Sequence, residues 1–324
     1  MTALINILKF RIGLLILAFS LIGLVACKNN PTQVNPKTNN KTAINEQDVQ
    51  LANNVLSQSL ASNSDGLMSS MYDLTGTITP TGFHYDSRSG TNTENTDYIA
   101  GSNEDNGDNS GDNRGKDSGF RIHYNPKTGI HTVEFNRELH TTNIDKTLHL
   151  KLEYIFRDTL GVYLQFPVPS KIESIDYKGL RHGTLKTPKK NSTFSRIDTL
   201  YFSGLQDASN TLTLNGSHTA YGEIQMTDST NQQLHKKYSL RLKLINVTIS
   251  KDSLYHDKNL ENAITGVLNY DVKIRQVNDS TKVDQSFTGT VNLNGNGYAL
   301  LKFVNFPKKF LVNLKNGDIK QDNN

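Results

Sequence analysis

Few residues in this sequence combine the type and the spacing that catalysis requires. The chain contains no G-x-S-x-G, S-x-x-K or H-E-x-x-H motif and no glycine-rich phosphate loop. The segment G-N-G-Y-A-L at residues 295–300 follows the dinucleotide fingerprint only in part. It lies between two expected strands, so we interpret it as a turn. We therefore predict no catalytic residue, no cofactor and no enzymatic activity.

Two groups of residues have the types that bind metals. The nine histidines do not cluster at ligand spacings, and the hairpin expected around His123 and His131 puts these two on opposite faces. Segment 106–117 matches part of a calcium-binding loop through Asn106, Asp108, Ser110, Gly111 and Asp117. Its first place is Asn rather than Asp, an apolar place holds Asn113, and no helices flank it. We therefore predict no metal site.

Cys27 is the only thiol of the 324-residue chain, and a thiol is nucleophilic enough to take a thioether-linked lipid. The residues before it, 12–26, are uncharged and almost all apolar. Lys9 and Arg11 precede this run, and no acid occurs in the first 26 residues. This layout is typical of a secretory signal peptide. The run is shorter than the ~20 apolar residues that span a bilayer.

The residues Leu24, Val25, Ala26 and Cys27 resemble the lipobox of bacterial lipoproteins, and the resemblance covers only this segment. It implies signal cleavage before Cys27, a diacylglyceryl group on the thiol and an acyl chain on the new amine. Two or more chains anchor a protein firmly. The resemblance therefore implies a protein anchored to a bacterial membrane, with the outer membrane favoured and the exposed face left open. The alternative is a stray thiol inside an ordinary signal peptide.

One stretch of cations could attract an anionic partner. Residues 177–197 hold His182, no acid before Asp198, and six cations: Lys178, Arg181, Lys186, Lys189, Lys190 and Arg196. We interpret the stretch as a solvated loop, with contact to anionic headgroups or to the acidic segment 90–119 as the alternative. The net charge of +4 does not indicate a basic nucleic-acid-binding surface, so we expect no nucleic-acid partner.

Composition divides the chain into five segments. Residues 1–26 form the expected signal peptide, and 27–44 the lipidated cysteine with a flexible tether. Residues 45–89 hold a helix and the start of the β domain. Segment 90–119, rich in Asn, Asp and Gly, is interpreted as a disordered insertion. Residues 120–324 form the antiparallel β domain.

The clearest helix follows Asn45, which can cap it. Apolar residues recur there at spacings of three and four, from Val49 to Leu60, and Gly66 is a plausible stop. The polar face consists of Asn, Gln and Ser rather than basic residues, so we expect the helix to pack on a sheet and not to lie on a membrane.

From Phe120 onward, apolar and polar side chains alternate with a period of two residues. The alternation is clearest in the stretch F-R-I-H-Y-N-P-K-T-G-I-H-T-V-E-F. A four-residue loop at 126–129 suits its Pro and Gly. The resulting register pairs Phe120 with Phe135, Ile122 with Val133 and Tyr124 with His131 on one face, and Arg121 with Glu134 and His123 with Thr132 on the other.

Further alternating runs occur at 148–156, 162–166, 240–244, 270–274 and 310–314. L-H-L-K-L at 148 returns as L-R-L-K-L at 240, and T-L-T-L-N-G at 211 returns as T-V-N-L-N-G at 290. A diverged duplication and coincidence both fit, because alternating Leu with Asn-Gly is common in hairpins. We predict a mainly β fold, an antiparallel β-sandwich or strongly bent sheet with one N-terminal amphipathic helix. A closed barrel or open half-barrel is the alternative.

These observations favour a lipid-anchored cell-envelope lipoprotein that acts as a non-enzymatic binding or structural module. The alternative is an envelope hydrolase whose residues are too scattered to form a motif. Expected partners are the membrane, through the anchor, and a protein, glycan or lipid of the envelope. The absence of Trp weakens a sugar-stacking platform, although Tyr and Phe can serve.

Overall fold

The computed structural model describes residues 46–78, 116–227, 233–257, 259–277 and 284–322. The described residues all belong to one compact unit, Ile44–Asn324. Cys27 and the tether lie outside the described residues. So do Asn106, Asp108, Ser110 and Gly111 of the calcium-loop match.

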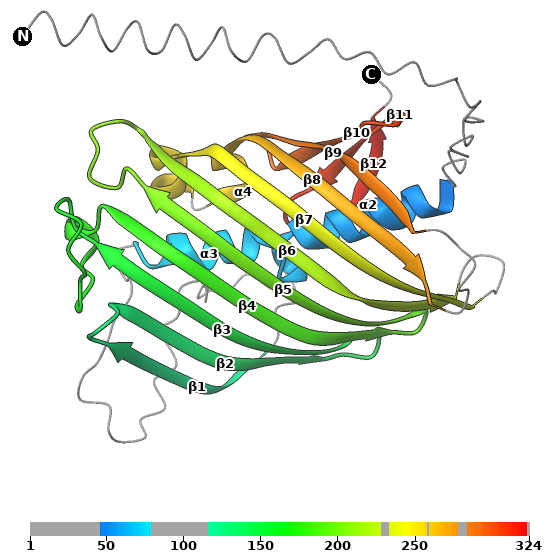
Figure 1. Ribbon diagram of the computed structural model, residues 1–324, viewed down its shortest axis with the longest axis horizontal. Helices are drawn as coiled ribbons and strands as arrows, with labels where there is room; N and C mark the ends of the chain where they lie inside the picture. The colour runs from blue at the N-terminus through cyan, green and yellow to red at the C-terminus, as the bar shows by residue number, and fades with distance from the viewer. Residues whose placement is uncertain (1–45, 79–115, 228–232, 258, 278–283, 323–324) are drawn as a thin grey trace, which may run out of the picture. The chain divides into compact units, whose positions relative to one another are not determined.

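Twelve antiparallel strands in the described residues form one sheet, and each strand pairs with its neighbours in the sequence (Figure 1). The strands are β1 (Lys116–Asn125), β2 (Ile130–His140), β3 (Asp145–Arg157), β4 (Ser174–Thr187), β5 (Lys190–Ser203), β6 (Thr211–Thr227), β7 (Gln233–Ser250), β8 (Ile264–Gln276), β9 (Gln285–Asn294), β10 (Tyr298–Phe303), β11 (Phe306–Asn313) and β12 (Ile319–Asp322). The mainly β prediction is confirmed. A single sheet is found rather than two packed sheets, and it is not closed, because β1 and β12 are its two edges.

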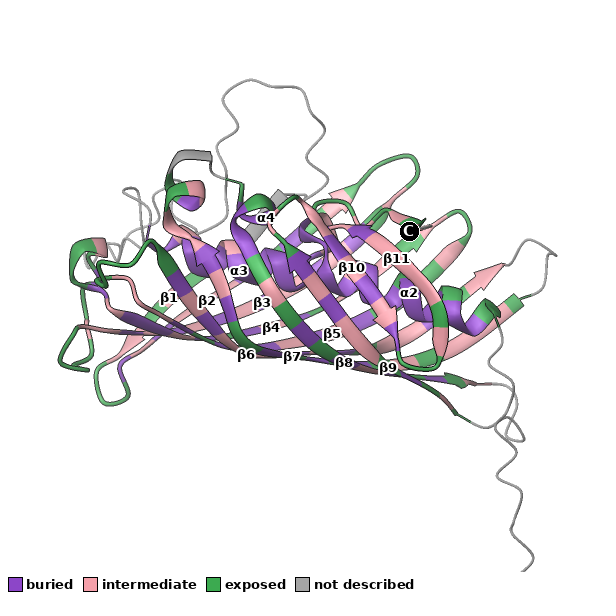
Figure 2. Ribbon diagram, turned by 90° about the horizontal axis from the view of Figure 1, so that it is seen from above, coloured by how far each residue is buried: buried purple, intermediate pink, exposed green. Residues whose placement is uncertain are grey.

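Two helices lie against the concave face of this sheet, α2 (Glu46–Leu60) and α3 (Leu67–Gly76) (Figures 1 and 2). Four short helical segments complete the described elements: η1 (Ser62–Ser64), η2 (Pro169–Lys171), η3 (Ser253–Asp257) and α4 (Leu260–Ala263). Helix α2 buries Val49, Ala52 and Leu56 and contacts β7, β8, β9, β11 and β12. The core is therefore formed between the helices and the inward side chains of the strands.

Gly66 does not end the first helix. Helix α2 stops at Leu60, and Gly66 precedes α3 in extended backbone. A Cβ at Gly66 would lie 2.7 Å from the carbonyl oxygen of Ser59, so a side chain has no room there. The glycine permits the tight connection between the two helices.

The predicted β1–β2 hairpin is present, with Arg121 opposite Glu134, Ile122 opposite Val133, His123 opposite Thr132 and Tyr124 opposite His131. Its turn closes through the amide of Gly129, which donates to the carbonyl of Asn125 (2.8 Å) at a φ of 70°. The expected pairing of Phe120 with Phe135 is absent, because the register shifts between Ser118 and Arg121. Strand β1 also begins at Lys116, inside the segment interpreted as an insertion.

Two other strand-level predictions are wrong. Residues 162–166 form no strand and make only one isolated bridge, between Arg157 and Tyr163. Gly161 at a φ of 78° and the two nearby prolines account for this, because proline cannot donate to a sheet ladder. Residues 177–197 are no loop: they form most of the β4–β5 hairpin, in which Arg181 and Arg196 are buried.

The two pairs of repeated phrases are separated by different numbers of strands in the sheet. L-H-L-K-L and L-R-L-K-L lie on β3 and β7, whereas the Asn-Gly phrases lie on β6 and at the end of β9. Asn215 and Gly216 are inside β6, at a register shift, and form no turn. The segment 295–297, by contrast, forms the expected turn between β9 and β10.

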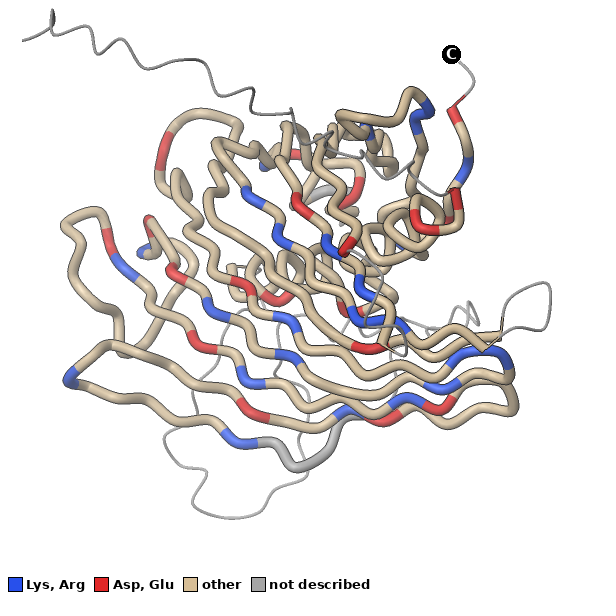
Figure 3. Tube along the Cα trace, turned by 45° about the vertical axis from the view of Figure 1, so that its right-hand side comes forward, with Lys and Arg blue, Asp and Glu red and all other residues tan. Residues whose placement is uncertain are grey.

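Charged residues of both signs are interspersed along the strands of the sheet (Figure 3). Exposed ion pairs such as Arg275–Asp284 and Lys237–Glu223 lie across neighbouring strands or turns. In the described part of the chain, no helix is long and apolar enough to cross a membrane.

Candidate functional site

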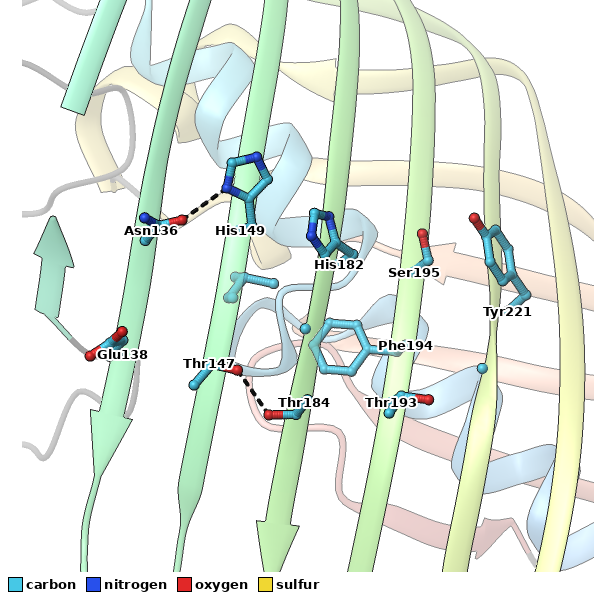
Figure 4. A pocket seen from close by; sticks show the side chains of 13 residues that line it. Asn136, Glu138, Thr147, His149, His182, Thr184, Thr193, Phe194, Ser195 and Tyr221 are labelled. Carbon is cyan, nitrogen blue, oxygen red and sulfur yellow. Dashed lines mark hydrogen bonds between the residues drawn. The ribbon is translucent and has the colours of Figure 1, made fainter. Parts of the chain in front are cut away.

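A shallow groove of about 460 Å³ crosses the solvent-facing side of β2 to β6 (Figure 4). One row of polar side chains runs along it, with each member directly opposite the next on the neighbouring strand. The row is Asn136, His149, His182, Ser195 and Tyr221. Because side chains alternate between the faces of a strand, all five point away from the helices. A second row, with Thr147, Thr184 and Thr193, borders the first.

Contacts along the groove hold part of this row in place. His149 Nδ1 lies 2.8 Å from Asn136 Oδ1, and the two threonine hydroxyls of Thr147 and Thr184 are 2.8 Å apart. The rings of His149 and His182 have centroids 4.9 Å apart. The Tyr221 side chain is 49% exposed. The groove thus presents hydrogen-bonding groups and an aromatic ring on a scaffold of paired strands.

Two glycines shape the floor of the groove. Gly183 and Gly222 both lie opposite Phe194, one on each side. A Cβ at Gly183 would overlap the carbonyl oxygen of Thr147, and a Cβ at Gly222 that of Thr193. Glycine therefore lets neighbouring backbones approach closely beneath the groove.

The helix-facing side of the same strands carries a buried ionic cluster. Arg181 of β4 donates to Asp198 Oδ2 (3.2 Å) and to Tyr177 Oη (3.1 Å). Its guanidinium also donates to Asp73 and Ser70, which lie one turn apart on α3. Ser70 in turn donates to Asp198 Oδ2 (2.6 Å). This cluster fastens α3 to the sheet.

The two carboxylates of the cluster have opposite pKa shifts. Burial raises the pKa of Asp73 to about 6, because it outweighs the attraction of Arg181. Burial acts in the same direction on Asp198, but the hydrogen bond and charge of His218, with Arg181 and Ser70, bring its pKa below the usual value. His218 Nδ1 lies 2.7 Å from Asp198 Oδ1. Of these two carboxylates, Asp73 is therefore the one whose pKa is closer to neutral.

A second buried carboxylate joins the helical segment to β2 and β3. Asp65, in the left-handed region at a φ of 53°, pairs with Lys146 and lies 3.5 Å from Arg137 Nη1. Burial would raise its pKa, but the two cations hold the pKa below the usual value.

Among the described residues, the serines beside His218 and His182 form no hydrogen bond to a histidine. In the buried cluster, the Ser70 hydroxyl donates to the Asp198 carboxylate and not to His218, and all three side chains are sealed from solvent. In the groove, Ser195 faces His182 across the strands, but no hydrogen bond joins them among the described contacts. The side-chain amide of Asn136, which could hold a histidine ring in place, contacts His149 and not His182.

His123 and His131 lie on opposite faces of the hairpin, as expected. His123 is exposed, whereas His131 is fully buried, has its ring centre 4.5 Å from that of the tilted Tyr124 ring and has a pKa lowered by burial. Among the described residues, no group of three His, Cys, Asp or Glu side chains could hold a metal ion.

The six cations of 177–197 do not act together. Arg181 and Arg196 point inward, while Lys178, Lys186 and Lys189 are exposed. One signal for this was present in the sequence. Arg196 and Asp198 alternate in step with Leu200 and Phe202, so period two assigns all four to one face. The partners on α3 carried no such signal.

No known protein family, curated protein or solved structure shows significant similarity to this chain.

Proposed function

We propose that this protein is a lipid-anchored, non-enzymatic binding module of a bacterial cell envelope, favoured in the outer membrane, and that the groove is its ligand site. The observation that supports this most is the continuous row from Asn136 to Tyr221 across five paired strands. Such a row offers donors and acceptors at regular spacing along one direction, which suits an extended ligand. A glycan chain fits the chemistry best, because amide, imidazole and hydroxyl groups bind sugar hydroxyls and an exposed Tyr ring stacks on a sugar face.

The anchor in this proposal is Cys27, on the lipobox resemblance of residues 24–27. The amphipathic helix α2 then belongs to the packed domain, since its apolar side faces the sheet, and membrane attachment is left to the lipid. A hydrolase is the weaker alternative, because no hydrogen bond joins a serine hydroxyl to a histidine ring among the described residues.

The binding proposal is tested with soluble fragments of envelope glycans in a titration calorimeter. We expect binding by the unmodified protein, and a loss of about tenfold or more in Tyr221→Ala, since stacking on one ring contributes on the order of 1 kcal/mol and its removal also opens the groove. Tyr201→Ala is the matched control, because Tyr201 is also exposed on the outer face but lies outside the groove. Equal affinity in both variants, or no glycan binding at all, would refute the proposal.

The anchor is tested by Cys27→Ser in a bacterial expression host. We expect the unmodified protein to partition into detergent with added lipid mass, and the variant to remain uncleaved and unlipidated. Identical partitioning with no lipid mass in either protein would exclude lipidation at Cys27.

A further inference from the structure

A second hollow lies on the helix-facing side of the sheet, where the ends of β2 to β7 approach α2 and η1. It has a volume of about 220 Å³, and three cations line it: Lys146, Lys190 and Arg196. Phe194 lines both this cavity and the outer groove, but the two hollows open on different faces. No aspartate or glutamate is among the residues that line the cavity.

The three cations differ in how far their charges are balanced. Lys146 pairs with the buried carboxylate of Asp65. Lys190 donates only to a neutral amide oxygen, Gln58 Oε1 (3.0 Å). Arg196 is 3% exposed, donates to the backbone carbonyl of Ser64, and has no acceptor for its Nε. Two cations of the cavity are thus bonded only to neutral groups.

Leaving such charges without a counterion is costly in a buried setting. Burial and the neighbouring charge of Arg196 lower the pKa of Lys190 to about 8, and burial lowers that of Arg196. Asp65 also attracts Arg196, but its carboxylate is already shared by Lys146 and Arg137. An added anion would therefore relieve a local excess of positive charge.

Part of the cavity wall is apolar. It is formed by Leu139, Ile144, Leu185, Phe194 and Ile224. The guanidinium of Arg196 lies 4.7 Å from the centre of the Phe194 ring, so the charged and apolar walls meet at this pair. A bare inorganic anion would fill the cationic end and leave the apolar wall against water.

We propose that this cavity binds an amphipathic organic anion, a monocarboxylate whose head lies between Lys190 and Arg196 and whose apolar body lies against Leu185 and Ile224. The volume corresponds to about seven water molecules at ~30 Å³ each, so the body has roughly six to nine carbon atoms. This site is separate from the groove, and its occupancy does not depend on the function proposed for the groove.

Calorimetric titration with octanoate tests this proposal directly, with 1-octanol and inorganic phosphate as comparison ligands. We expect octanoate to bind with a Kd below about 100 µM, which lies within the affinity that ten non-hydrogen atoms can provide. Octanol should bind at least tenfold more weakly, because it lacks the charge. Shortening the acid from octanoate to hexanoate should weaken binding by roughly fourfold per methylene.

A variant pair locates the site. Lys190→Met should weaken octanoate binding by at least about tenfold, since it removes a charge-assisted hydrogen bond. Lys189→Met is the matched control, because the neighbouring Lys189 is exposed and does not line the cavity.

Three results would overturn the proposal: equal affinity for octanol and octanoate, tight competition by phosphate alone, or equal losses in the two variants. The comparison among ligands uses the unmodified protein, so it holds even if a variant folds poorly.

Discussion

Replacing Asp73 by asparagine should change how the stability of the domain depends on pH. Asp73 is 6% exposed on α3 and shares Arg181 with Asp198. Its pKa is raised from 3.8 to about 6, chiefly because burial disfavours the charged carboxylate. Between these two pH values the folded state holds the proton while the unfolded state has released it. Unfolding therefore becomes easier as the pH rises through this window.

The magnitude follows from the size of the shift. About two pKa units correspond to roughly 3 kcal/mol. The unfolding free energy of the native protein minus that of Asp73→Asn should fall by about this amount between pH 4 and pH 7, and then level off. The subtraction removes the titration of all groups that the substitution leaves alone.

Urea unfolding at a series of pH values measures this difference, provided that the slope of free energy against urea is the same for both proteins. Asp284→Asn is the control of opposite sign. A hydrogen bond from Arg275 lowers the pKa of the exposed Asp284, so its contribution to stability is present at neutral pH and is lost on acidification. A difference for Asp73 that is flat or that rises with pH would refute the assignment of a raised pKa to this residue.

Three further outcomes follow from other parts of the structure. Arg181→Met should destabilise the fold by about 3–5 kcal/mol in chemical unfolding, because it leaves Asp73 and Asp198 buried without their cation. Arg275→Met is the control and should have little effect on stability, because its ion pair is exposed. Similar losses of stability in both variants would contradict this account. Gly183→Ala should lower the free energy of unfolding by about 1–3 kcal/mol and also weaken glycan binding, because the added Cβ overlaps the Thr147 carbonyl under the groove. An unchanged melting temperature would contradict this, because it would show that the strands can move apart there. Binding of octanoate at pH 8–9 should take up a fraction of a proton, since the anion raises the pKa of Lys190 from about 8, the value to which burial and the charge of Arg196 lower it. Calorimetry in buffers of different ionisation enthalpy measures this uptake, and none is expected in Lys190→Met.

The strand pattern was readable from the sequence because each strand repeats a local rule. The alternation from Arg121 to Tyr124 and from His131 to Glu134 fixes one register, and the structure has it. The same rule failed for 162–166, where apolar side chains alternate but Gly161 and the prolines prevent pairing. Alternation shows which side chains share a face, but not whether a partner strand is present.

The buried ionic cluster could not be predicted in the same way. Arg181 was assigned to solvent because an arginine is rarely buried unless it is paired. Its partners Asp73 and Asp198 are 108 and 17 residues away in the sequence, so no local pattern links them. The groove was missed for a similar reason, since His149 and His182 become neighbours only through the pairing of β3 with β4.

A sheet whose strands pair only with their sequence neighbours can assemble one hairpin at a time, starting from β1. Most of its contacts close short loops, which favours rapid folding for an antiparallel protein of this size. Helix α2 is the exception. It precedes every strand in the sequence, yet it contacts β7, β8, β9, β11 and β12. As the chain is made or delivered from its N-terminus, Val49, Ala52 and Leu56 therefore remain without their final partners until the second half of the sheet has formed. Over that interval the helix is the segment most in need of a chaperone, and mutations that delay β7 to β12 should increase aggregation more than mutations that delay β1 to β3.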